Sequence, residues 1–176
     1  MKKIIVALTL SILAVFSNET NAATCRLTHS VPQPIADQSL ISINFDSTEK
    51  DTFPADCHDE AIFTHYIMTQ QAGCYIGVVQ VTFSANDFGD RLVTVFAKPN
   101  MLAPVSPSMP IAAVTQKATG SGQPTRVNVS FNYCHEVSSP QIIGGIYVQA
   151  YQTSGSTLNI SKGTDYTPIF WAVKID

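Results

Sequence analysis

Hydrophobic and polar residues alternate with a period of two along much of the chain, which is typical of β-strands buried on one face. The clearest run is Thr125 to Cys134, where Val127, Val129, Phe131 and Tyr133 alternate with polar or charged residues. The same pattern predicts strands over Ser39–Asp46, Gly145–Gln152 and Thr167–Ile175. In the last of these we expect the alternating apolar side, Ile169, Trp171, Val173 and Ile175, to face the core.

The segment from Gly73 to Lys98 predicts two strands joined by a turn. Tyr75–Ser84 and Arg91–Lys98 are rich in apolar residues, and Asn, Asp and Gly dominate the residues between them. The first strand is apolar on both faces, because Ile76 and Val78 lie opposite its main apolar side. We therefore expect a β-hairpin at the centre of the fold, covered from both sides.

Other segments are less regular. Residues 59–71 carry an apolar stripe that fits a helix and a run that fits a strand equally well. Pro99 to Pro110 contains four prolines and is expected to be a loop, followed by a short edge strand over Ile111–Thr115.

Short strands separated by polar turns, with at most one short helix, predict a mainly β fold. We expect an antiparallel β-sandwich, immunoglobulin-like or jelly-roll-like, stabilised by disulfides. The chain has 176 residues, and we assign residues 23–176 to a single β-sandwich domain.

The first 22 residues have the layout of a secretory signal peptide. Two lysines precede an apolar run over residues 4–16, and Thr20-Asn21-Ala22 follows with small side chains suited to cleavage. The run is too short to span a membrane. We expect a secreted or periplasmic bacterial protein without membrane insertion.

The net charge of −3 and the lack of a basic cluster argue against nucleic acid as a partner.

Four cysteines in an exported chain indicate two disulfides. We favour Cys57–Cys74 with Cys25–Cys134, which would close one short and one long loop. The alternative is Cys25–Cys57 with Cys74–Cys134, since Cys74 and Cys134 both lie at strand ends.

Several groups of residues suggest metal chemistry but lack its spacing. Cys57-His58-Asp59-Glu60 and Cys134-His135-Glu136 contain zinc and copper ligands without a C-x-x-C or H-E-x-x-H motif. Residues 46–56 and 86–90 are rich in oxygen ligands but do not match the twelve-residue calcium loop. We therefore predict no cofactor or metal. The chain also lacks a G-x-S-x-G elbow, a phosphate loop and a dinucleotide motif, so we lean against catalysis.

The Pro-rich loop offers a candidate partner-binding site formed by Met101, Leu102, Val105 and Met109. Prolines lower the entropy cost of ordering such a loop on binding. These apolar side chains would either contact a partner or cover the open side of the sandwich, and we favour the cover. Tyr147, Tyr151 and Trp171 could instead form a sugar-binding surface, although Trp171 is expected in the core.

We expect an exported binding protein that recognises a protein or glycan through its loops, of unknown oligomeric state. The alternative is a surface-assembly subunit, because a small exported β-domain with an early cysteine resembles chaperone–usher pilus subunits. That resemblance implies completion by a neighbour's strand. This chain departs from it by ending Val173-Lys174-Ile175-Asp176 and by having four cysteines. A secreted hydrolase is a third reading.

Overall fold

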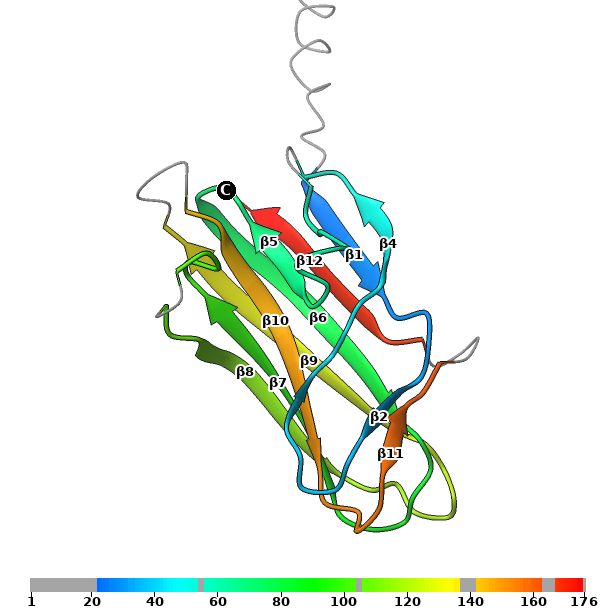
Figure 1. Cartoon of the computed structure of the whole chain (residues 1–176). Helices are drawn as coiled ribbons and strands as arrows, with labels where there is room; N and C mark the ends of the chain where they lie inside the picture. Colours follow the sequence, from blue (N-terminus) through cyan, green and yellow to red (C-terminus); the bar gives the residue numbers. More distant parts are fainter. Residues whose placement is uncertain (1–21, 54–55, 104–105, 137–141, 163–166, 176) are drawn as a thin grey trace, which may run out of the picture.

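Two antiparallel β-sheets packed face to face make up the computed structural model, which describes residues 22–53, 56–103, 106–136, 142–162 and 167–175 (Figure 1). No helix occurs among the described residues, so none of them forms one long and apolar enough to cross a membrane. The strands are β1 (Thr24–Thr28), β2 (Gln33–Ile35), β3 (Ile41–Ser42), β4 (Ser47–Asp51), β5 (Tyr66–Thr69), β6 (Gly73–Phe83), β7 (Asp90–Lys98), β8 (Met109–Lys117), β9 (Thr125–His135), β10 (Gly144–Gln152), β11 (Leu158–Ile160) and β12 (Ile169–Ile175).

The first sheet, sheet A, has seven strands. Its main path runs β2-β11-β6-β12-β1-β4, and β9 pairs with β6. β6 and β9 form a continuous ladder of eleven residue pairs, from Gly73 opposite His135 to Phe83 opposite Thr125. β12 pairs with β6 on one side and β1 on the other, so the end of the chain lies inside this sheet.

The second sheet, sheet B, has five strands in the order β3-β10-β7-β8, with β5 also paired to β10. β8 hydrogen-bonds with β7 and extends two residues earlier than the edge strand expected over 111–115. Pro110 falls inside it, which is tolerated because an edge strand leaves some amide positions unpaired.

The predicted antiparallel β-sandwich is confirmed, and its core lies between the two sheets. Alternate residues of β9 are buried, as its sequence pattern predicts: Val127 and Val129 are at most 1% exposed. Phe170 of β12 packs its ring against Phe45 and Phe131, with centroid distances of 5.2 and 6.0 Å. The described interior is therefore filled by side chains from both layers.

The prediction of a β-hairpin between Gly73 and Lys98 is wrong, although both of its strands are present. β6 belongs to sheet A and β7 to sheet B, so the connection over residues 84–89 crosses between layers. Sheets pack about 10 Å apart, a distance that six residues span easily. Gly89, at φ 75°, provides the turn, because a side chain there would collide with the carbonyl oxygen of Thr153. The inner faces of the two strands thus oppose each other across the core.

The favoured disulfide pairing is also wrong. The bonds are Cys25–Cys57 and Cys74–Cys134, which was the alternative. Cys25 and Cys57 are completely buried in the core, whereas Cys74 and Cys134 lie opposite each other on the outer face of sheet A. A disulfide requires the two Cβ atoms to lie about 3.5–4.5 Å apart, so a cysteine that faces the core and one on the outer side of sheet A cannot pair here.

Residues 59–71 resolve as turns followed by a strand. Asp59 Oδ1 accepts hydrogen bonds from the backbone N–H groups of Ala61 and Ile62, at 2.9 and 3.0 Å, and so stabilises the turn. Tyr66 to Thr69 then pairs with β10 as β5. The predicted signal peptide lies outside the described residues except for Ala22 and stays a prediction.

Candidate functional site

The outer face of sheet A is apolar at its centre. Successive residues of a strand point to opposite sides of a sheet, so burying Phe170 and Ala172 in the core turns Ile169, Trp171 and Val173 outward. On β6, burying Val79 turns Val78 outward in the same way. The six apolar residues on this side, here named the apolar face, are Ile76, Val78, Ile169, Trp171, Val173 and Ile175.

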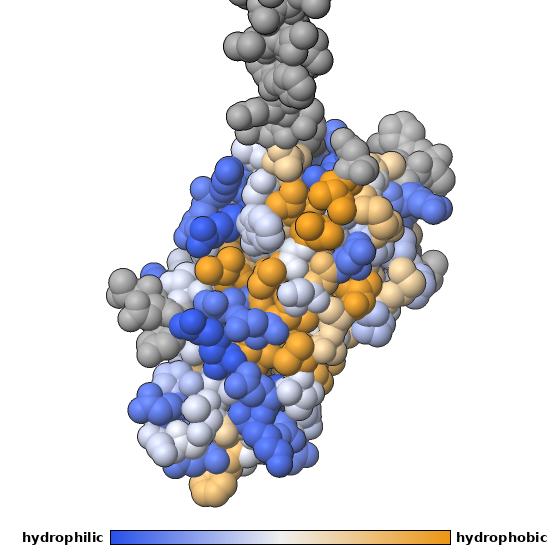
Figure 2. Space-filling model, turned by 180° about the vertical axis from the view of Figure 1, so that it is seen from behind, coloured by the Kyte–Doolittle hydropathy of each residue, from blue (hydrophilic) through white to orange (hydrophobic). Residues whose placement is uncertain are grey.

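The strand register brings these side chains together. Trp171 lies opposite Val78, and Val173 lies opposite Ile76, so two rows of apolar pairs cross from β12 to β6. Ile76 and Val78 are each 38% exposed and Ile175 is 40% exposed. Figure 2 shows this side of the molecule, with apolar side chains gathered between polar margins. Contiguous exposed apolar surface of this kind marks interaction sites more often than isolated exposed residues do.

Polar residues border the apolar face on both sides. On β1, Arg26 lies opposite Trp171, and Lys50 of β4 lies opposite Arg26. Arg26 Nε lies 2.9 Å from a carboxylate oxygen of Glu49. On the other side, Ser130 and Asn132 of β9 lie opposite Val78 and Ile76 and are exposed. One margin therefore carries the cations Arg26 and Lys50 together with the anion Glu49, and the other margin is neutral beside Ile76 and Val78.

A shallow pocket of about 560 Å³ lies beside the indole of Trp171. Apolar side chains form part of its wall, and Arg26 and Gln80 add hydrogen-bonding groups. Its complete lining is Thr24, Arg26, Lys50, Val78, Gln80, Ile169 and Trp171. The apolar face thus combines a flat apolar centre with one depression suited to a planar group.

Two expectations about this surface are wrong. Trp171 was expected in the core, and the first strand of the Gly73–Lys98 segment was expected to be covered on both faces. Both sides of β12 are apolar between residues 169 and 173, so the alternation alone does not determine which side faces inward. The sequence signal for the apolar face was present in Ile76 and Val78, which are apolar although they lie opposite the buried side of β6 and are exposed.

The residues of the predicted partner-binding loop differ in burial. Met101 is only 8% exposed, and its backbone N–H donates a hydrogen bond to the carbonyl of Ile143 at 2.7 Å. Leu102 is 58% exposed and Met109, in β8, is 43% exposed, while Val105 lies outside the described residues. Met101 is thus a cover for the sandwich, and the loop site as a whole stays a prediction.

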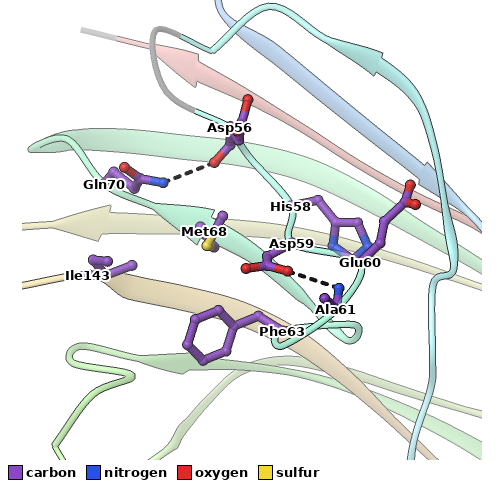
Figure 3. Close-up of a pocket in the computed structure, with 9 residues that line it drawn as sticks. All are labelled: Asp56, His58, Asp59, Glu60, Ala61, Phe63, Met68, Gln70 and Ile143. Atoms are coloured by element: carbon purple, nitrogen blue, oxygen red, sulfur yellow. Dashed lines mark hydrogen bonds between the residues drawn. The ribbon is translucent and has the colours of Figure 1, made fainter.

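A second depression, an open pocket of about 840 Å³, lies beside β5 (Figure 3). His58 Nδ1–H donates to the carbonyl of Tyr66 at 3.0 Å, and Gln70 donates to the carbonyl of Asp56 at 3.0 Å. Together with the turn-stabilising role of Asp59, these bonds show that its polar groups hold the local backbone. The lining residues are Asp56, His58, Asp59, Glu60, Ala61, Phe63, Met68, Gln70 and Ile143.

Several of the residues considered for metal binding have structural partners. Both Cys57 and Cys134 are oxidised in disulfides. Asp51 accepts hydrogen bonds from the backbone of Phe53 and Cys57, and Asp87 accepts one from Gly122. Across the described ranges, no group of three or more His, Cys, Asp or Glu residues is placed to hold an ion.

Two buried histidines make stability depend on pH. His29 and His135 are 2% and 3% exposed, and burial lowers the pKa of each below its ordinary value of 6.5. For His29 this is opposed by the carbonyl of Asn44 and the carboxylate of Asp46. Because the unfolded chain binds these protons at a higher pH than the folded chain, acid favours unfolding.

We therefore expect the histidine contribution to be complete above pH 6.5 and to be lost progressively as the pH falls towards the folded-state pKa values. The slope should not exceed about 1.4 kcal/mol per pH unit for each histidine. Denaturant unfolding at several pH values measures how the free energy of unfolding changes with pH. The double variant His29→Gln, His135→Gln should have a flatter profile between pH 7 and pH 5. Parallel profiles would show that other groups cause the acid sensitivity.

Comparisons with known proteins support the fold and leave the family open. No protein-family model and no curated protein matches this chain. A solved structure that it resembles is that of Eiger TNF from S. frugiperda, with a TM-score of 0.54 and 10% sequence identity. The match covers 88% of this chain and 93% of that chain. At this identity the likeness concerns the fold alone, and it agrees with the β-sandwich described above.

Proposed function

We propose that this protein is an exported interaction protein that binds a protein partner through the apolar face. The observation that carries the proposal is a row of six outward-facing apolar side chains on adjacent strands of one sheet, of which Ile76, Val78 and Ile175 are exposed and the others, Trp171 among them, are partly exposed. Burying such surface stabilises a complex by about 25 cal/mol per Å² before the costs of association. The binding surface is therefore a sheet face rather than the loops.

The margins of the apolar face indicate the chemistry of the partner. Arg26 and Lys50 lie along one side of Trp171, and Glu49 already pairs with Arg26, so a complementary partner has a flat apolar surface with a carboxylate opposite Lys50. Seven residues of β12 and its two neighbouring strands span about 23 by 14 Å, which is about 330 Å², or about 700 Å² for both partners together. That area is below the roughly 1,000 Å² of a stable specific interface, so the proposed complex is a weak and reversible one.

Trp171 is expected to be the main contributor to binding, since tryptophan is enriched among interface residues whose loss costs 2 kcal/mol or more. Trp171→Ser should weaken binding by about 30-fold or more. A partner is first isolated by using the wild-type domain to capture proteins from the extracellular medium of the organism that produces it. Titration calorimetry with that purified partner then gives the Kd of each variant. Trp171 is the only tryptophan, so its fluorescence reports directly on coverage of the apolar face.

Leu102→Ser provides the matched control, because Leu102 is exposed but lies in the loop after β7, outside the apolar face. It should leave the Kd unchanged. The partner could instead be another copy of this chain. In that case the tryptophan emission of the wild-type protein alone should shift as its concentration rises, together with an increase in its molecular mass in solution. Trp171→Ser should abolish that increase in mass. Equal Kd values for Trp171→Ser and wild type would contradict the proposed surface.

A glycan is the second candidate, favoured by the depression beside Trp171. Its indole could stack on a sugar ring while Arg26 and Gln80 hydrogen-bond to hydroxyl groups. A single sugar site does not need the second apolar row. Ile76→Ser should therefore weaken a protein complex and leave glycan binding unchanged, which separates the two candidates on a glycan array and in calorimetry.

A further inference from the structure

The two disulfides differ sharply in exposure. Cys25 and Cys57 are 0% exposed and belong to the core between the sheets. Cys134 is exposed and Cys74 is partly exposed, because both point away from the core on the outer side of sheet A. Thiol–disulfide exchange requires a thiolate to reach one of the two sulfur atoms. In the folded protein that approach is open at Cys134 and closed at the buried bond.

The surrounding strands allow the exposed bond to open without separating the sheet. Cys74 and Cys134 are directly opposite in the β6–β9 ladder, with Tyr75 opposite Tyr133 next along it. Eight further pairs continue to Phe83 opposite Thr125. On its other side β6 pairs with β12, where Ile175 lies opposite Cys74. The backbone around the two sulfurs is therefore held by hydrogen bonds that do not depend on the S–S bond.

We propose that Cys74–Cys134 is a thiol–disulfide exchange site, which reacts with the thiolate of a small thiol or of a cysteine-containing protein. The incoming thiolate attacks Sγ of Cys134, forms a mixed disulfide there and displaces Cys74 as a thiolate, which takes a proton from water. A second thiolate attacks the mixed disulfide and releases Cys134. Two thiols are oxidised to one disulfide, and the protein bond gains two electrons.

The position of this bond connects it to the apolar face. Ile175, opposite Cys74, is the last member of that face, and Ile76 follows Cys74 on the same side of β6. A group attached to Cys134 would consequently stand at the border of the apolar face. The exchange chemistry needs no bound partner, so it fails or succeeds independently of the proposed protein interaction.

The test uses the folded, fully oxidised protein and reduced glutathione under native conditions. Samples are quenched with acid at intervals, alkylated, and mapped by peptide mass spectrometry. Alkylated Cys74 and glutathionylated Cys134 should appear at least about tenfold faster than any modification of Cys25 or Cys57, which serve as the internal control. Opening of both bonds at one rate, or of neither before denaturant is added, would overturn the proposal.

Two further experiments test the site with a single-cysteine variant and with a different thiol. In Cys74→Ser the thiol of Cys134 is already free, and oxidised glutathione should convert it directly to the mixed disulfide. This variant keeps the proposal testable even if full reduction unfolds the chain. Replacing glutathione with a reduced thioredoxin-like protein distinguishes the two thiol sources, since a protein needs more room than a tripeptide around Cys134. Failure of Cys134 to react in the single variant would refute the site for either source.

Discussion

Replacing Arg91 with alanine is expected to lower the free energy of unfolding by about 3–5 kcal/mol. Arg91 is completely buried at the start of β7. Its guanidinium donates to the carbonyls of Phe88 and Asp90, at 3.0 and 3.1 Å, and to that of Asn86 at 3.4 Å. Removing it would take a donor from each of these carbonyls, although Asp90 keeps the backbone N–H of Thr153, and would leave a cavity above the ring of Phe83, whose centroid lies 5.9 Å from the guanidinium carbon.

The physical role of Arg91 is to hold the crossover between the two sheets. Burial lowers its pKa, although the neighbouring carboxylate of Asp90 opposes this effect. Hydrogen bonds from a charged donor are worth more than neutral ones, so three of them on one short loop fix its path. Arg91→Lys keeps a charge but loses the planar fork, and we expect it to lie between wild type and alanine.

Guanidinium unfolding followed by far-UV circular dichroism measures these differences. Arg26→Ala is the matched control, because Arg26 is an exposed arginine whose ion pair with Glu49 should contribute no more than about 1 kcal/mol. If Arg91→Ala and Arg26→Ala cost the same, the crossover does not depend on the buried guanidinium.

Removing the buried disulfide with Cys25→Ala and Cys57→Ala is expected to cost about 4 kcal/mol from the freed loop. Its cysteines are 32 residues apart, and the exposed pair is 60 residues apart, so loop entropy alone predicts nearly equal losses for the two bonds. The buried pair also fills core volume beside neighbouring side chains. Its removal should therefore cost about 1–2 kcal/mol more than removal of the exposed pair.

Cys74→Ala with Cys134→Ala is the comparison that isolates this excess. Both double variants keep one disulfide, and urea unfolding of each against wild type gives the two free-energy losses. Because the loop terms nearly cancel in the comparison, the excess measures packing around Cys25 and Cys57. A larger loss for the exposed pair would mean that the β6–β9 ladder depends on its disulfide, contrary to the geometry described above.

The disulfide pairing shows why part of this structure was beyond the reach of sequence reasoning. Cys74 and Cys134 lie at predicted strand ends, which made their pairing one of two reasonable alternatives. Loop length favoured neither strongly, since closure entropy changes slowly with length. What excluded Cys57–Cys74 is that Cys57 faces the core and Cys74 faces outward. The side on which a residue lies depends on strand pairing across the whole sheet.

Trp171 illustrates the same difficulty for the candidate site. Strand alternation correctly placed residues 167–175 in a strand, and β12 occupies 169–175. A shift of one residue exchanges the inner and outer faces, and both faces here carry apolar side chains. The contact of Phe170 with Phe45 and Phe131 is what turns Trp171 outward. No local pattern contains those two distant partners.

By itself, the sequence did not predict the short strands β1, β2 and β4, but it determined the long β-strands β6, β7, β9, β10 and β12, the antiparallel sandwich class and the presence of disulfide-forming cysteines. These depend on local alternation, turn residues and composition, which act over a few neighbouring positions. Only the tertiary structure decided that β6 and β7 lie in different sheets, which cysteines pair, and that Trp171 faces outward. Each of these depends on which distant strands lie side by side. The apolar face exists because β6 and β12, about 90 residues apart in sequence, are neighbours in sheet A.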